Sequence, residues 1–109
     1  MTPQSDTLQG TLDLLVLKTL ERAPNHGFGI TLHIQSASDG ALRVEEGSLY
    51  PALRRLERDK VIAGEWKTTE NGRRARYYRL TRAGVRRLAE TERRWAELTR
   101  SVGRVLRHA

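Results

Sequence analysis

The 109-residue sequence contains no cysteine. This absence excludes a disulfide framework and a thiolate metal site, and nothing argues for an oxidising compartment. Long apolar runs are also missing, since the longest, Leu-Leu-Val-Leu at 14–17, lies between Asp13 and Lys18 and is far too short to span a bilayer. The first seven residues, MTPQSDT, lack the basic region of a signal peptide. We therefore expect a cytoplasmic protein.

Patterns typical of catalysis or metal binding are missing too. No Ser-His-Asp or Cys-His arrangement can be placed, and His-Gly-Phe-Gly at 26–29 supplies only two glycines of a dinucleotide fingerprint, with no strand before them. His26 and His33 are seven residues apart, but no cysteine or convergent carboxylate joins them, so a zinc or iron site is not expected. His26 is expected to cap or pack at the start of a helix. We predict no enzyme, no metal and no cofactor.

Positive charge is abundant and unevenly placed. The formal net charge is +7. Residues 1–50 carry three basic and six acidic side chains, whereas residues 51–109 carry seventeen basic and seven acidic ones. This concentration is typical of a surface that binds nucleic acid or an anionic membrane. A generally basic soluble protein is the alternative.

Apolar periodicity predicts three helices in the first sixty residues. Residues 8–22 carry apolar side chains at three- and four-residue spacing on two sides, which indicates cover from the chain's own domain and from a partner. Residues 26–38 form the second helix, and residues 42–44 are suited to a short strand. The third helix is expected to begin at Ser48 as N-cap, so that Pro51 lies in the first turn, where its missing N–H has no intrahelical partner.

The third helix has two different faces. Leu49, Ala52, Leu53 and Leu56 gather on one side, which we assign to the core. The other side presents Pro51, Arg54 and Arg58, flanked by Tyr50. Alone, such arginines are as consistent with a solvated face as with a binding surface.

After residue 61 the apolar period changes from 3.6 to 2. Residues 62–69 alternate as a strand, Glu70-Asn71-Gly72 forms a turn, and residues 74–80 return. Asn-Gly readily takes the positive φ angles of a tight hairpin. Tyr77 and Tyr78 both compete for the inward face of the returning strand, and we favour Tyr78 with Leu80.

The last helix is expected to begin after Thr81 as N-cap and to run for about 27 residues, or ~40 Å. Val85, Leu88, Trp95, Val102 and Leu106 occupy heptad a and d positions, with Leu98 and Val105 widening the stripe and polar Glu92 and Thr99 interrupting it. A domain of this size cannot cover so long a helix. An intermolecular contact is therefore predicted.

This order predicts a mostly α fold with a small β-hairpin. It comprises a winged helix-turn-helix over residues 1–80 and a C-terminal dimerisation helix over residues 81–109. In such a fold the third helix enters the DNA major groove, and the arginine-rich hairpin supplies phosphate contacts. A protein-interaction adaptor that uses the same elements without DNA is the alternative. A membrane-surface helix is disfavoured, because the last helix pairs its arginines with glutamates.

Three stretches resemble the PadR family of transcriptional regulators: LDLLVLKTLERAPNHGFGI, VEEGSLYPALRRLERDKVI and ENGRRARYYRLTRAG. The resemblance covers residues 8–95. It implies a homodimeric winged-helix repressor of the short subgroup, which ends in one dimerising helix and binds a pseudo-palindromic site in double-stranded DNA. Phe28 departs from the family, which often has tyrosine after His-Gly, and this puts in doubt a hydrogen bond there but not the fold.

The helix faces and the resemblance together give two sets of site residues. The predicted DNA-binding residues are Ser48, Tyr50, Pro51, Arg54, Arg58, Asn71, Gly72, Arg73, Arg74 and Arg76. The predicted dimer-interface residues are Leu12, Leu15, Leu88, Trp95, Leu98, Val102 and Leu106. Some family members bind a small aromatic or cationic effector through a tryptophan of the last helix, which implies this role for Trp95. The alternative is that Trp95 only packs at the dimer seam.

Overall fold

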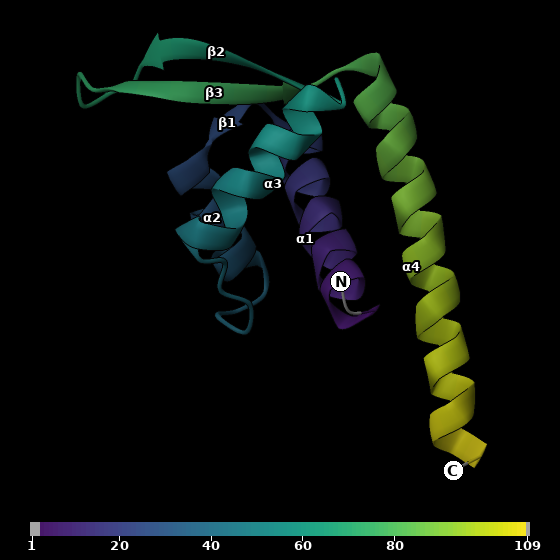
Figure 1. Ribbon diagram of the computed structural model, residues 1–109. Helices are drawn as coiled ribbons and strands as arrows, with labels where there is room; N and C mark the ends of the chain where they lie inside the picture. The colour runs from purple at the N-terminus through teal and green to yellow at the C-terminus, as the bar shows by residue number, and fades with distance from the viewer. Residues whose placement is uncertain (1–2, 109) are drawn as a thin grey trace.

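The computed structural model describes residues 3–108, of which residues 3–9 are described by their backbone alone. Three helices, a hairpin and a long last helix follow one another as predicted for a winged helix, but the short strand precedes the second helix instead of following it (Figure 1). The elements are α1 (Pro3–Arg22), β1 (Asn25–His26), α2 (Gly27–Ala37), α3 (Glu46–Arg58), β2 (Ile62–Thr68), β3 (Arg74–Leu80) and α4 (Arg82–His108). Figure 1 shows α4 running beside α1 and continuing past it, which explains the elongated extents of 55 × 29 × 28 Å.

Helix α1 begins at Pro3, five residues before the predicted start. The prediction missed this first turn because residues 3–7 carry no apolar period, while proline is well suited to the opening position of a helix. Leu8, which belonged to the predicted apolar stripe, falls where only the backbone is described. Farther along, Val16, Leu17 and Leu20 are buried, as their spacing predicts.

One core joins the helices to the root of the sheet. Apolar side chains from α1, α2, α3, β2, β3 and α4 meet there, which is how a helix stripe and a sheet face both leave water. Its buried members are Val16, Leu17, Leu20, Ile30, Ile34, Leu49, Leu53, Leu56, Val61, Ile62, Tyr78 and Leu88.

Helix α3 starts at Glu46, so the prediction of Ser48 as N-cap was wrong. The carbonyl of Glu45 accepts the N–H of Leu49 at 2.9 Å, which places the cap three residues earlier. Pro51 is therefore the sixth helical residue rather than part of the first turn. Its missing N–H leaves the carbonyl of Gly47 without the usual i→i−4 donor.

The sheet has three antiparallel strands in the order β1-β3-β2. The predicted strand at 42–44 was wrong: the extra strand is β1, where Asn25 pairs with Tyr78 and His26 with Tyr77. The two residues of β1 follow Pro24 and are too few to show an alternating pattern. Residues 42–44 resemble a strand in composition partly because of Val44, which packs against the core from a loop. Strand β2 pairs with β3 from Ile62↔Leu80 to Thr68↔Arg74.

The hairpin turn lies where it was predicted, but with a different backbone. Gly72 has a φ of 80°, whereas Asn71 keeps a negative φ. The N–H of Gly72 donates to the Thr69 carbonyl at 2.9 Å, and the N–H of Thr69 donates to the Arg73 carbonyl at 2.6 Å. This is a three-residue loop closed by a left-handed glycine. In β3, Tyr78 is buried and Leu80 packs on the core, as favoured from the sequence.

Helix α4 agrees with the prediction in its start and its length of 27 residues. The N–H of Gly84 donates to Thr81 Oγ1 at 3.1 Å, and the Thr81 hydroxyl donates to the Lys60 carbonyl at 2.7 Å. Leu88, predicted at the dimer interface, is only 2% exposed and belongs to the chain's own core. That assignment is corrected, because the heptad pattern cannot distinguish a side chain buried by its own chain from one buried by a partner.

Candidate nucleic-acid interface

The two faces of α3 separate as the sequence predicted. Leu49, Ala52, Leu53 and Leu56 are buried, and their packing fixes the helix on the core. The outer face presents side chains that the sequence assigned to DNA. These are Ser48, Tyr50, Pro51, Arg54 and Arg58, all exposed.

Tyr50 is held against the start of α2. A Cβ added at Gly27 would lie 3.0 Å from the Tyr50 hydroxyl oxygen, so the tyrosine ring uses the space that a side chain at position 27 would fill. The neighbouring turn is capped by His26, whose Nδ1 accepts the N–H of Gly29 at 3.1 Å. The prediction that His26 caps α2 is therefore confirmed. Phe28, beside it, is exposed.

The hairpin of β2 and β3 forms the wing. Asn71, Gly72, Arg73 and Arg74 are exposed around its tip. The Arg74 guanidinium lies 5.4 Å from the centre of the Trp66 ring, close enough for a cation–π contact. Trp66 is itself 57% exposed, so the wing presents an aromatic surface together with its arginines.

Arg76 differs from the other wing arginines, because its side chain turns to α3. Its Nη2 donates to Glu57 Oε2, and both side chains are about one-third exposed. This hydrogen bond, which the Glu57 carboxylate accepts, raises the pKa of Arg76 above its ordinary value. Sequence reasoning placed Arg76 with the phosphate-seeking charges and missed Glu57, since a contact between residues 19 apart leaves no local pattern.

Wing and helix face one common side. Tyr50 of α3, Trp66 of β2 and Arg74 of β3 line one open pocket of ≈ 400 Å³ at their junction. Aromatic side chains of α3 and β2 and an arginine of β3 therefore share one surface at this junction.

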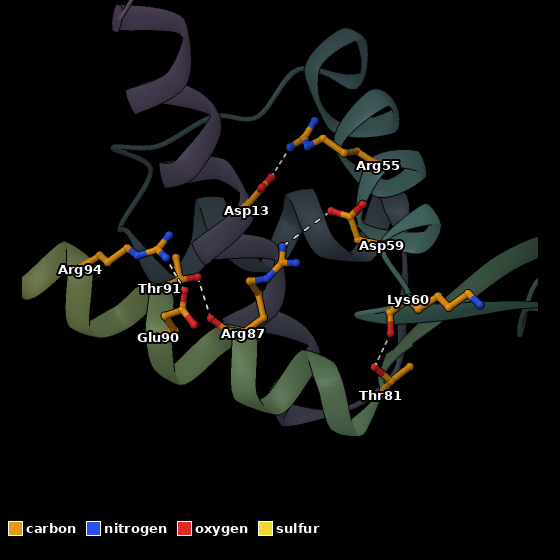
Figure 2. A network of polar contacts seen from close by, with 9 residues as sticks. All are labelled: Asp13, Arg55, Asp59, Lys60, Thr81, Arg87, Glu90, Thr91 and Arg94. Atoms are coloured by element: carbon orange, nitrogen blue, oxygen red, sulfur yellow. Dashed lines mark hydrogen bonds and ion pairs between the residues drawn. The ribbon is translucent and has the colours of Figure 1, made fainter.

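The side of α3 nearest α1 and α4 is held by ion pairs (Figure 2). Arg55 Nη2 donates to Asp13 Oδ1, a contact between α3 and α1 in which both side chains are less than one-quarter exposed. Asp59, at the end of α3, lies 3.7 Å from Arg87 of α4. Burial raises the pKa of Asp13 above its ordinary value, and the neighbouring Arg55 only partly offsets this. Arg55 thus points away from the face that carries Arg54.

A second surface lies along α4. Val85, Trp95, Leu98, Val102, Val105 and Leu106 are all exposed large apolar residues. Leu12 and Leu15 of α1, also predicted at the interface, are partly buried against the core. Trp95 borders a pocket of ≈ 260 Å³ between the two helices, together with Leu14 and Leu98.

Two general findings bear on other classes of function. Within the described part of the chain, no three histidine, cysteine or acidic side chains gather as a metal site. No helix of residues 3–108 is both long and apolar enough to cross a membrane.

Comparison with known proteins identifies the family to which this chain is similar. The family model described as "Transcriptional regulator PadR-like family" matches residues 16–90. The transcriptional regulator Rv3488 of Mycobacterium tuberculosis is 42% identical over 77 residues, which cover 71% of this chain and 68% of that protein.

Solved structures agree in fold over nearly the whole chain. A PadR family transcriptional regulator from Eggerthella lenta is 36% identical with a TM-score of 0.74, covering 94% of this chain and 88% of that one. A transcriptional regulator from Clostridium thermocellum is 25% identical with a TM-score of 0.82, covering 91% and 96%. Sequence and winged helix-turn-helix fold together show that this chain belongs to the PadR-like family, which consists of transcriptional regulators and not of enzymes.

Proposed function

We propose that this protein is a homodimeric repressor that binds a pseudo-palindromic operator in double-stranded DNA. The observation that carries the proposal is the single surface shared by the outer face of α3 and the wing, on which Tyr50, Trp66 and Arg74 border one pocket. A helix beside a basic ribbon suits duplex DNA, because the major groove admits the helix while the ribbon follows the backbone.

The residues on this surface divide by the contact that each can make. Tyr50, Arg54 and Arg58 recur every four residues and so follow one stripe of α3. Arginine forms paired hydrogen bonds with guanine in the major groove, which makes Arg54 and Arg58 candidates for reading sequence. Arg73 and Arg74 at the wing tip are candidates for phosphate contacts, which add affinity without sequence preference.

A second copy of the chain is the proposed partner for α4. Its exposed apolar side chains at Trp95, Leu98 and Val102 continue the stripe beyond the part of the helix that the core covers. A two-fold dimer buries the same stripe twice and presents two α3 helices, which matches an operator with half-sites about 34 Å or a multiple apart.

Footprinting on the DNA upstream of the protein's own coding region tests the proposal. We expect a protected palindrome, with affinity that falls steeply as salt rises because counterions are released. Replacing Arg73 and Arg74 with alanine should weaken binding to every sequence and flatten the salt dependence by ~0.9 per lost phosphate contact. Replacing Tyr50 or Arg54 should change which sequences are preferred. Absence of any protected palindrome at moderate salt would overturn the proposal in favour of a protein-interaction adaptor.

Release by a small aromatic or cationic effector is the regulatory part of the proposal. The pocket beside Trp95, with Leu14 and Leu98, offers an apolar wall and an indole face suited to a planar cation. In a Trp66→Phe variant Trp95 is the sole tryptophan, so a planar aromatic cationic dye that binds there should quench its fluorescence and weaken operator binding. Unchanged fluorescence at saturating dye would leave Trp95 as a packing residue of the dimer seam.

A further inference from the structure

A carboxylate on the proposed DNA side of α3 calls for an explanation. Glu57 precedes Arg58 on the same helix and is about one-third exposed. Beside a phosphate backbone, a negative charge opposes binding through simple repulsion. If Glu57 supports DNA binding, it must therefore do so through a contact with another residue and not through its own charge.

The partner of Glu57 is Arg76, and this arginine is held on several sides. Its guanidinium lies 5.9 Å from the centres of both the Trp66 and the Tyr78 rings. It also crosses Gly64 so closely that a Cβ there would lie 2.7 Å from Arg76 Nε. Aromatic faces and a missing side chain on β2 thus guide the arginine from the sheet to Glu57.

The position of Arg76 in the sheet indicates what its contact with Glu57 does. Among the described residues, β1 pairs only with Tyr77 and Tyr78, so the three-stranded part of the sheet ends there. Outward from the Trp66↔Arg76 pair the wing is a two-stranded ribbon that reaches Thr68↔Arg74 and the turn. Such a ribbon is marginally stable and free to twist on its own. The ion pair to Glu57 ties it to α3 at the first step beyond the third strand.

We propose that Glu57 and Arg76 are positioning residues that set the angle between the wing and α3, so that Arg76 acts through Glu57 and not on a phosphate. This inference rests on the proposed DNA binding. A partly exposed ion pair adds little to the stability of a fold, so loss of the pair should leave the folded chain intact and change only how wing and helix fit one DNA duplex.

The direction in which one substitution changes operator affinity distinguishes a positioning role from a simple charge effect. Glu57→Gln removes a negative charge from the DNA side, which by repulsion alone would strengthen binding. Positioning predicts instead that operator affinity falls by about tenfold, the usual order for loss of a coupled contact. Glu70→Gln at the exposed wing tip is the matched control, since it removes the same charge near the same DNA. It should leave affinity equal or higher.

Arg76 provides the second measurement. Arg76→Gln should weaken binding with the salt slope unchanged, whereas Arg73→Gln should weaken it and flatten the slope by ~0.9. Combining Glu57→Gln with Arg76→Gln should weaken binding no more than Arg76→Gln alone, because both remove one contact. Arg76→Lys keeps the positive charge but loses the planar donor, so affinity should fall there too.

A readout without DNA keeps this inference separate from the proposed function. In a Trp95→Phe background Trp66 is the sole tryptophan and reports on the wing. Glu57→Gln should lower its fluorescence anisotropy, while Glu70→Gln should not. If the protein binds no DNA at all, the proposed function fails whatever Trp66 shows. If the unaltered protein binds its operator but Glu57→Gln binds as tightly or more tightly, with unchanged anisotropy, the positioning role is overturned.

Discussion

Leu98 offers a quantitative test of the proposed dimer. It lies on the exposed stripe of α4 and is 44% exposed in the single chain. Full burial of a leucine contributes about 1.5–3 kcal/mol, so covering the exposed share contributes about 0.7–1.3 kcal/mol per protomer. A two-fold interface counts this twice, and Leu98→Ala should therefore destabilise the dimer by about 1.3–2.6 kcal/mol.

Such a change raises the dimer dissociation constant about ten- to hundredfold. Sedimentation velocity over a dilution series measures it directly. The matched control is Leu32→Ala, because Leu32 is 51% exposed but lies on α2, away from the proposed interface. Dissociation should be unchanged in that variant. The reasoning is refuted if the two variants dissociate alike, or if the unaltered chain stays monomeric at high micromolar concentration.

Three further predictions concern stability. Because burial raises the pKa of Asp13 above 3.8, the folded state holds this proton more tightly than the unfolded state, and the resulting stability is present below pH 3.8 and lost as pH rises through the raised pKa. In urea titrations the unfolding free energy of the unaltered protein minus that of Asp13→Asn should fall as pH rises through that window, because the asparagine amide does not titrate; a difference that stays constant with pH would contradict the burial argument. Gly84→Ala places a Cβ 2.0 Å from the Val61 carbonyl oxygen, so it should destabilise by about 1–3 kcal/mol or more in thermal unfolding. Pro51→Ala restores a donor to the Gly47 carbonyl and should raise the melting temperature, whereas an unchanged or lower value would show that the proline is well accommodated within α3.

Local patterns were enough to predict most of the architecture. The period of the apolar residues predicted each amphipathic helix and the hairpin. Thr81 and His26 could be predicted as caps, because a capping contact joins residues only a few positions apart. The exposed face of α3 followed from the same periodicity. These features depend on neighbours in sequence, so the sequence shows them directly.

The errors arose where local signals were weak or ambiguous. The N-cap of α3 is Glu45 and not Ser48, because helix packing on the core outweighs one favourable cap residue. Strand β1 is too short to have a period of its own and exists only because β3 offers it a free edge. Leu88 fitted the heptad stripe, yet it is buried in the chain's own core.

The amino-acid pattern alone thus established a basic winged helix with a long apolar-striped last helix. Only the tertiary structure decided which of its arginines remain available to an anionic partner. Arg54, Arg58, Arg73 and Arg74 stay exposed, whereas Arg76 is committed to Glu57. The physical reason is that an arginine's partner is chosen by distance in space. The carboxylate that engages Arg76 lies on another element, where no spacing rule in the sequence points to it.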